Sequence, residues 1–224
     1  MLLSIKNIFD ADRLQNMREM LAKAEFIDGK YSAGENASRV KQNMEMKPTS
    51  LQADYLDRMI MSTLAENEDF RRAALPHQAS QPVFARYTKG MHYGEHIDDP
   101  VMGTSGGRFR ADIAVTVFLN DPLEYGGGEL VINTTFGEQI VKLAAGDAVI
   151  YPASSLHRVN KIIKGERLVA VCWIQSLVRD PSRREILYGL NNARQTLMQN
   201  QPEAKESKQV DHAYVNLVRM WSEV

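Results

Sequence analysis

Residues 146–160 read GDAVIYPASSLHRVN and contain the pattern that repeats through the middle of the chain. A glycine-containing turn precedes a short run of β-branched and aromatic residues at 148–151, and a second run at 157–160 follows a short loop. Short runs of this composition between turn residues are typical of β-strands. The stretch therefore predicts two strands joined by a short connection.

The same pattern of short strand-like runs between turn residues extends in both directions from this stretch. From residue 81 onward, β-branched and aromatic residues occur in short runs between glycine, proline and asparagine turns. The other expected strands are residues 83–88, 110–119, 129–132, 138–141 and 167–175. Their spacing suits an antiparallel sandwich or barrel. We therefore expect a mainly β core with flanking helices.

The part before the core has helical patterns. Its first helix carries Leu14, Met17 and Leu21 at helical spacing behind Asp10, which can cap the first turn through its carboxylate. A polar, glycine-bearing stretch at 28–48 follows. A second helix is then expected to open at Ser50, and a third, short one to cover residues 66–74.

The part after the core is also helical. One helix is expected to follow Asp180-Pro181, with Ile186, Leu187 and Leu190 on one side. A polar break at 201–209 separates it from a last helix, whose apolar residues are Tyr214, Leu217, Val218 and Trp221. The apolar face of this last helix could pack on its own core or on a second subunit, so a homo-oligomer is one of two open alternatives.

Length and composition bound the organisation of the protein. A chain of 224 residues can form one sizeable core. We expect an N-terminal helical segment at 1–80 that packs on the core, the core itself at 81–177, and a C-terminal helical segment at 178–224. A net charge of −1 gives no field that would attract nucleic acid, and no apolar run is long enough to span a membrane. We therefore expect a cytoplasmic protein with no evidence for a nucleic acid or membrane partner.

Cys172 is the single cysteine and lies within the longest apolar run, residues 168–174. One cysteine excludes an internal disulfide and a cysteine cluster for zinc. Because no activating base is near it in the sequence, buried packing is expected rather than nucleophilic chemistry.

The chemistry is concentrated in residues 94–100, which read GEHIDDP. In extended backbone, His96 and Asp98 point to the same face because strand side chains alternate. A second, distant imidazole at His157 would complete a 2-His-1-carboxylate set, which is typical of non-haem Fe(II) oxygenases. The H-x-D pair alone is short enough to occur by chance, so it needs support from other residues.

That support comes from the order of the residues. His157 follows Asp98 by 59 positions (157 − 98), and Arg167 follows ten positions later. This order, together with the phrases FARYTKGMHYGEHIDDP, ADIAVTVFLN, YGGGEL and HRVNKIIKGER, resembles the PKHD-type hydroxylases, in the prolyl-4-hydroxylase-like branch of the Fe(II)/2-oxoglutarate-dependent dioxygenases. The resemblance covers residues 81–175, and SAGENASRVKQN extends it towards the N-terminus.

The resemblance implies a double-stranded β-helix, or jelly-roll, core. It implies that His96, Asp98 and His157 ligate Fe(II), that Arg167 binds the distal carboxylate of 2-oxoglutarate, and that the Tyr87 hydroxyl holds the same carboxylate. The planar guanidinium of arginine suits a carboxylate because it can pair with both oxygens. The implied reaction uses dioxygen, converts 2-oxoglutarate to succinate and CO2, and hydroxylates an unidentified substrate, with L-ascorbate helping to keep the iron as Fe(II).

Two alternatives remain open at this stage. The same iron chemistry could end in demethylation or desaturation rather than hydroxylation. In a different class, the chain could be a non-catalytic cupin-like metal-binding or sensing module. Arg167 argues against that second alternative, because a purely structural metal does not need a receptor for a carboxylate.

Other polar and aromatic residues have two interpretations each. Arg39, Lys41, Asn43, Arg108 and Arg110 could reach the mouth of the barrel or belong to solvated surface. His92 and Tyr93 could shape the substrate mouth or pack their loop.

The remaining features of the core are expected to be structural. Trp173 shares strand parity with Arg167, but packing is the default for a large aromatic residue. Asp99 points away from Asp98 in extended backbone and is expected to be a loop carboxylate. Residues 126–128, Gly-Gly-Gly, precede a strand and are expected to be a bend in the barrel.

Overall fold

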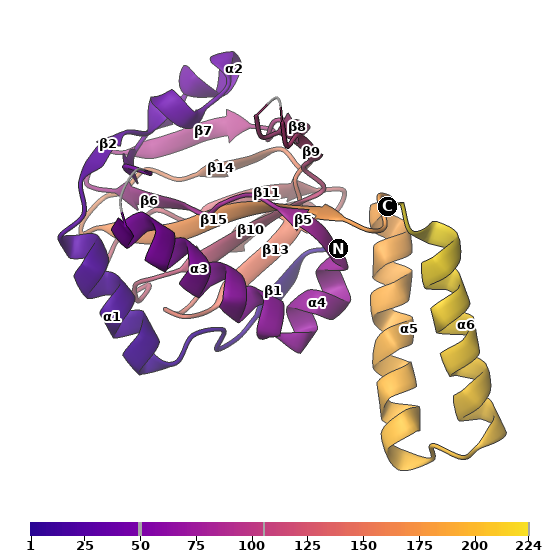
Figure 1. Ribbon diagram of the computed structural model, residues 1–224. Coiled ribbons are helices and arrows are strands. Elements are labelled where there is room, and N and C mark those ends of the chain that lie inside the picture. The colour runs from indigo at the N-terminus through magenta and orange to yellow at the C-terminus, as the bar shows by residue number, and fades with distance from the viewer. Residues whose placement is uncertain (49–50, 105, 224) are drawn as a thin grey trace.

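The computed structural model describes residues 1–48, 51–104 and 106–223. Two antiparallel sheets enclose the interior, and the helices α1 (Ala11–Ala22), α3 (Leu51–Glu66) and α4 (Glu68–Ala74) cover the outer face of the larger sheet (Figure 1). The larger sheet has the order β1 (Leu3–Ile5), β13 (Ala148–Pro152), β10 (Ile113–Phe118), β15 (Arg167–Ser176), β6 (Val83–Tyr87), β4 (Met44–Met46) and β2 (Phe26–Asp28), and β5 (Pro76–Ala79) also pairs with β15. The mainly β, jelly-roll class with flanking helices is confirmed.

The smaller sheet forms the opposite wall of the interior. Its order is β12 (Gly137–Val141), β11 (Leu130–Thr134), β14 (His157–Val159), β7 (His92–His96) and β3 (Lys41–Gln42). A separate hairpin pairs β8 (Val101–Met102) with β9 (Phe109–Arg110). Each of the seven predicted strands corresponds to a strand here, although the run expected at 110–119 is divided between β9 and β10.

Strand β15 shows why the central strands have continuous apolar sequence. Successive side chains on a strand point to opposite faces. Its residues on the helix side are Leu168, Ala170, Cys172 and Ile174, and those on the interior side are Arg167, Val169, Val171 and Trp173. Both faces are covered, so only the identity of Arg167 within the run indicates chemistry.

The helices begin where the sequence predicts. Helix α1 (Ala11–Ala22) is capped by Asp10, whose carboxylate accepts a hydrogen bond from the Arg13 backbone N–H at 2.7 Å. Helix α4 (Glu68–Ala74) begins after the cap residue Asn67, two residues later than expected. Helix α3 (Leu51–Glu66) lies where the second helix is predicted, but its proposed start at Ser50 falls outside the described residues.

The segment before residue 81 contains more strand than its sequence suggests. The polar stretch at 28–48 includes a 3-10 helix, η1 (Gly29–Ser32), a short helix, α2 (Glu35–Ser38), and the strands β3 and β4. Strand β3 pairs with β7 of the smaller sheet, whereas β4 pairs with β6 of the larger sheet. The chain therefore crosses from one sheet to the other within six residues and closes one side of the interior.

The C-terminal part is a helical hairpin that extends beyond the β core (Figure 1). Helix α5 (Pro181–Asn200) packs on α4 and on α6 (Lys205–Trp221). Because α6 begins at Lys205, the polar break ends at residue 204, earlier than expected. Leu187 is buried, whereas Ile186 is 55% exposed, so these two residues do not share one side of the helix as expected. In the described ranges, no helix combines the length and apolar composition that a membrane crossing requires.

Candidate functional site

Strand pairing brings the two distant histidines together. In the pairing of β14 with β7, His157 lies directly opposite His96, and Asp98 follows two residues after the end of β7. Oδ1 of Asp98 lies 4.0 Å from Nε2 of His96 and 3.8 Å from Nε2 of His157. One ligand atom from each residue falls within 4.8 Å of the others. This arrangement could hold one metal ion.

Each histidine is oriented by its other ring nitrogen. Nδ1 of His96 lies 2.8 Å from the Gly94 carbonyl oxygen, and Nδ1 of His157 lies 2.9 Å from that of Ser155. A carbonyl only accepts, so both Nδ1 atoms donate, and in a neutral imidazole this tautomer leaves the lone pair on Nε2. The carbonyl partner that metal-binding histidines usually have is thus present for both.

The charge states in this cluster also favour a cation. Burial, followed by the neighbouring His157, lowers the pKa of His96 to about 3, so its imidazole is neutral at physiological pH. Burial raises the pKa of Asp98, an effect that His157 and Trp173 oppose. Oδ2 of Asp98 has no hydrogen-bond partner within the described chain. A bound divalent ion would offset the desolvation of this carboxylate.

Tyr93 adds an aromatic support to the cluster. Its ring stacks on the His96 imidazole. Lys41 lies opposite Tyr93 in the pairing of β3 with β7, and its Nζ is 5.2 Å from the centroid of the Tyr93 ring. Tyr93 also lines the cavity described below. His92 does not line the cavity described below.

Arg167 is a buried cation at the other end of the site. It lies opposite Tyr87 in the pairing of β15 with β6 and is 1% exposed. Its guanidinium carbon lies 5.1 Å from the Tyr87 ring centroid and 5.6 Å from that of Phe118. Within the described residues it forms no ion pair, and its Nε has no hydrogen-bond partner. A buried guanidinium without an anion is costly.

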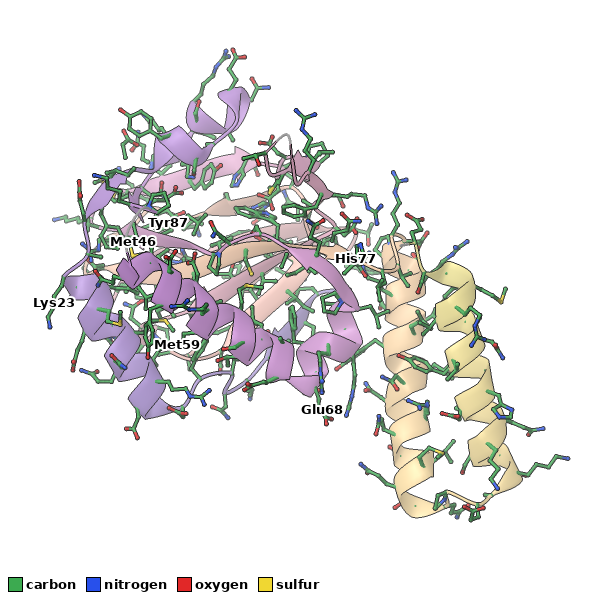
Figure 2. All side chains as sticks on the ribbon, in the orientation of Figure 1. Lys23, Met46, Met59, Glu68, His77 and Tyr87 are labelled. Atoms are coloured by element: carbon green, nitrogen blue, oxygen red, sulfur yellow. The ribbon has the colours of Figure 1, made fainter. Side chains whose placement is uncertain are left out.

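Tyr87 lies among the strands of the core (Figure 2). Burial raises the pKa of its hydroxyl to about 12, although the positive charge of Arg167 acts in the opposite direction. The hydroxyl therefore remains protonated at physiological pH. It can donate a hydrogen bond to an anion that Arg167 also binds.

The triglycine segment, residues 126–128, passes close to the side chain of Arg167. Gly128 has a φ of 71°, and a Cβ there would lie 2.4 Å from Cδ1 of Ile162 and 3.1 Å from Cδ of Arg167. Gly126 bridges to Lys164 across the turn. Residues 126–128 are thus a turn that lets the chain approach Arg167 closely, in addition to the bend that the sequence predicts.

A cavity of about 370 Å³ connects the two ends of the site. The predicted residues that line it are Tyr87, His96, Asp98, His157 and Arg167. All five are therefore brought together around one space. Trp173 also lines this cavity, so packing alone does not describe it. Asp99 lines it as well but is not part of the three-residue metal cluster.

The N-terminal segment supplies polar residues to the same cavity. Lys41 and Asn43 line it and are buried, whereas Arg39 and Arg108 are exposed. Arg110 instead pairs with Asp112 at 2.7 Å and with Glu223 at 3.2 Å.

Glu45 is a cavity residue that the sequence argument missed. Its Oε1 lies 2.5 Å from Nζ of Lys41, which also donates to Oγ of Ser32 at 2.9 Å. The run Lys41-Gln42-Asn43-Met44-Glu45-Met46 contains the signal that could have identified it. Polar residues at 41, 43 and 45 alternate with a second set, which is the period of a strand.

Family models match most of the chain after residue 81. The model described as the 2OG-Fe(II) oxygenase superfamily matches residues 82–175. The model described as the PKHD-type hydroxylase C-terminal domain matches residues 182–223. The first match contains the metal cluster and Arg167, and the second contains the helical hairpin.

Curated relatives match the chain over its whole length. A PKHD-type hydroxylase of Thioalkalivibrio sulfidiphilus is 51% identical over 224 residues, which covers 100% of both chains. A PKHD-type hydroxylase of Pseudomonas putida is 43% identical over 226 residues, again with 100% of both chains covered.

Solved structures share the fold at low sequence identity. A prolyl-4-hydroxylase of Pseudomonas putida has a TM-score of 0.53 at 19% identity, covering 78% of this chain and 92% of that one. A prolyl hydroxylase of Trichoplax adhaerens, in complex with a hypoxia inducible factor peptide, has a TM-score of 0.56 at 15% identity, covering 83% and 86%. A non-haem α-ketoglutarate-dependent epimerase from nogalamycin biosynthesis has a TM-score of 0.57 at 16% identity, covering 79% and 78%.

Proposed function

The chain belongs to the PKHD-type hydroxylases of the 2OG-Fe(II) oxygenase superfamily, and from this membership we propose which of its residues hold the iron and which hold 2-oxoglutarate. It is an Fe(II)- and 2-oxoglutarate-dependent hydroxylase. The likeness to prolyl hydroxylases is one of fold and does not assign proline as its substrate.

We assign the iron to Nε2 of His96, Nε2 of His157 and one carboxylate oxygen of Asp98. The donor set is the 2-His-1-carboxylate type that suits Fe(II) and leaves coordination positions open. The neutral state of His96 supports this assignment, as does Oδ2 of Asp98, which has no hydrogen-bond partner among the described residues. Bound iron supplies the dioxygen activation that couples decarboxylation of 2-oxoglutarate, to succinate and CO2, with hydroxylation of the substrate.

The distal carboxylate of 2-oxoglutarate is assigned to Arg167 and the Tyr87 hydroxyl. The observation that carries this proposal is the burial of Arg167 at the cavity wall, where no carboxylate of the described residues pairs with it. A dicarboxylate would supply the missing charge and could accept from both the guanidinium and the phenol. Arg167 and Tyr87 would then orient 2-oxoglutarate so that its keto-acid end faces the metal cluster.

Several wider features belong to the same proposal. L-ascorbate would keep the iron as Fe(II) between turnovers, and dioxygen is the second cosubstrate. We place the protein in the cytoplasm, with the functional core at 81–177 between an N-terminal segment at 1–80 and a C-terminal segment at 178–224. Pairing of two subunits through the C-terminal hairpin would give a homo-oligomer.

The alternative is a non-catalytic cupin-like metal-binding or sensing module. Such a module would need the three metal residues but not Arg167. A buried, unpaired guanidinium would then lower the stability of the fold without a compensating ligand. The position of Arg167 in the cavity that holds the metal cluster therefore favours the enzyme.

The test is anaerobic addition of Fe(II) and 2-oxoglutarate, followed by visible absorption. Chelation of Fe(II) by the keto acid should give a weak charge-transfer band in the wild-type protein and none in Asp98→Ala. The matched control is Glu95→Gln, which changes an exposed carboxylate beside His96 on the other face of β7. A band that never forms, or that survives Asp98→Ala, would overturn the metal assignment.

A second variant tests whether Arg167 binds 2-oxoglutarate separately from the residues that bind Fe(II). Arg167→Ala should weaken 2-oxoglutarate binding and leave Fe(II) binding unchanged. An equal loss of both would count against the separate roles of Arg167 and the metal cluster.

A further inference from the structure

We propose that Asn43 is a further binding residue for 2-oxoglutarate, and that its side-chain amide joins Arg167 and Tyr87 at the distal carboxylate. This inference rests on the proposed function of the same cavity. It extends the binding site for 2-oxoglutarate to the N-terminal segment, which lies outside the stretch matched by the oxygenase family model.

Strand register places Asn43 beside the other two residues. Arg167 lies opposite Tyr87 where β15 pairs with β6, and Met44 lies opposite Arg86 where β4 pairs with β6. Asn43 immediately precedes Met44, so continuing the antiparallel register sets Asn43 level with Tyr87. Arg167, Tyr87 and Asn43 therefore form one row across three neighbouring chain segments.

The side chain of Asn43 is buried and lacks partners. It is 3% exposed and lines the cavity, yet neither its Oδ1 nor its Nδ2 makes a hydrogen bond of good geometry within the described part of the chain. An amide that is buried without partners is costly, so its presence at a cavity wall indicates a ligand.

The orientation of the amide suits an anion. A Cβ on Gly29 would lie 2.0 Å from Oδ1 of Asn43, so the oxygen faces the glycine backbone. The NH2 group is the other end of the same amide, and its hydrogens can be donated to a carboxylate oxygen in the cavity that Asn43 lines.

The charges around Asn43 explain why a neutral residue suits this position. The carboxylate of Glu45 is close enough to raise the pKa of Tyr87, but it is paired with Lys41 at 2.5 Å. The Lys41–Glu45 pair therefore has no net charge. A second carboxylate at position 43 would be unpaired and would repel the distal carboxylate of 2-oxoglutarate.

The experiment compares two ligands that differ only at the distal end. Anaerobic Fe(II) protein is titrated with 2-oxoglutarate and, separately, with 2-oxovalerate, which has the same keto acid but no distal carboxylate. Asn43→Ala should raise the Kd for 2-oxoglutarate about tenfold, the value of one hydrogen bond to a charged group. The Kd for 2-oxovalerate should change less than about twofold, since the lost hydrogen bond reaches only the distal carboxylate.

Asn43→Asp provides a second variant of almost the same shape. It should weaken 2-oxoglutarate binding more than Asn43→Ala does, and it keeps the test valid if the alanine variant does not fold. Gln42→Ala, which changes an exposed neighbour on β3, is the matched control and should bind both ligands as the wild type does.

The outcomes separate this inference from the function on which it rests. A wild-type protein without a charge-transfer band overturns the proposed function, and the role of Asn43 with it. A normal wild-type band with unchanged 2-oxoglutarate affinity in both Asn43 variants overturns only the role of Asn43. Equal weakening of both ligands in Asn43→Ala also overturns it, because a merely structural effect would not depend on the distal carboxylate.

Discussion

The ring of Tyr93 lies flat against the imidazole of His96, with 3.5 Å between their centroids and 13° between their planes. The hydrogen bond from Nδ1 of His96 to Gly94 restrains the same ring within its plane, at 2.8 Å. The two contacts act in different directions, so together they fix where Nε2 of His96 points. A metal ligand held in this way loses little freedom when the ion binds.

Tyr93→Leu should therefore weaken metal binding about tenfold, because an aliphatic side chain cannot provide a flat face for His96. Tyr93→Phe keeps the ring and removes only the hydroxyl, so its metal affinity should stay within about twofold of wild type. Co(II) titration followed by visible absorption measures both. Equal affinity in Tyr93→Leu and wild type would show that stacking does not position His96.

Gly128→Ala should lower both the stability of the fold and the affinity for 2-oxoglutarate. The left-handed backbone alone costs about 1–3 kcal/mol for a residue other than glycine, and the new methyl group would also displace Ile162 and Arg167. Gly137, with a φ of 102° and nothing within 4 Å of its added Cβ, is the matched control. Gly137→Ala should lose stability and keep its affinity for 2-oxoglutarate. Loss of affinity in both variants would contradict displacement of Arg167 as the cause.

The Lys41–Glu45 pair should respond unequally to single and double substitution. Lys41→Met leaves the Glu45 carboxylate buried without a partner and should lower the free energy of unfolding by about 3–5 kcal/mol. The double variant Lys41→Met/Glu45→Leu removes both charges and should lose less than the single variant. Urea unfolding measures the difference, and a double variant that is the less stable of the two would contradict it.

Cys172 should not react in the native protein. Burial raises the pKa of its thiol to about 12, so the thiolate is scarce at any pH below that value, and the side chain is 1% exposed. Iodoacetamide at pH 8 should label the chain only after denaturation, as measured by intact mass. Rapid labelling of the folded protein would indicate that the helix side of β15 opens readily.

The sequence predicts the central strands well because their signals are local. Turn residues separate runs of β-branched residues, and each run is long enough to show its pattern. Strands β3 and β4 have two and three residues, so the alternation across residues 41–46 is too short to distinguish a strand from a polar loop. Their extended conformation depends on β7 and β6, which are distant in the sequence, so tertiary pairing decides it.

Only some residues of the candidate site can be predicted from the sequence. The residue types and their order resemble a known family, and this resemblance identifies His96, Asp98, His157, Arg167 and Tyr87. The sequence alone could not distinguish Lys41 and Asn43 from solvated surface residues, because asparagine is mostly exposed and lysine is seldom buried unless it is paired. Its partner, Glu45, becomes evident only when the segment is known to be a strand. Tyr93 likewise needed the β14–β7 register, which places His96 in the cluster.

Strand β4 also has a consequence for how this enzyme could be dissected. A fragment that began at residue 82 would retain the whole stretch matched by the oxygenase family model, including the metal cluster and Arg167. It would nevertheless expose β6 as an unprotected sheet edge, a surface that readily recruits other chains. The smallest unit that folds and can be exchanged between relatives should therefore start before β2, with the transplanted core and its N-terminal edge strands moving together.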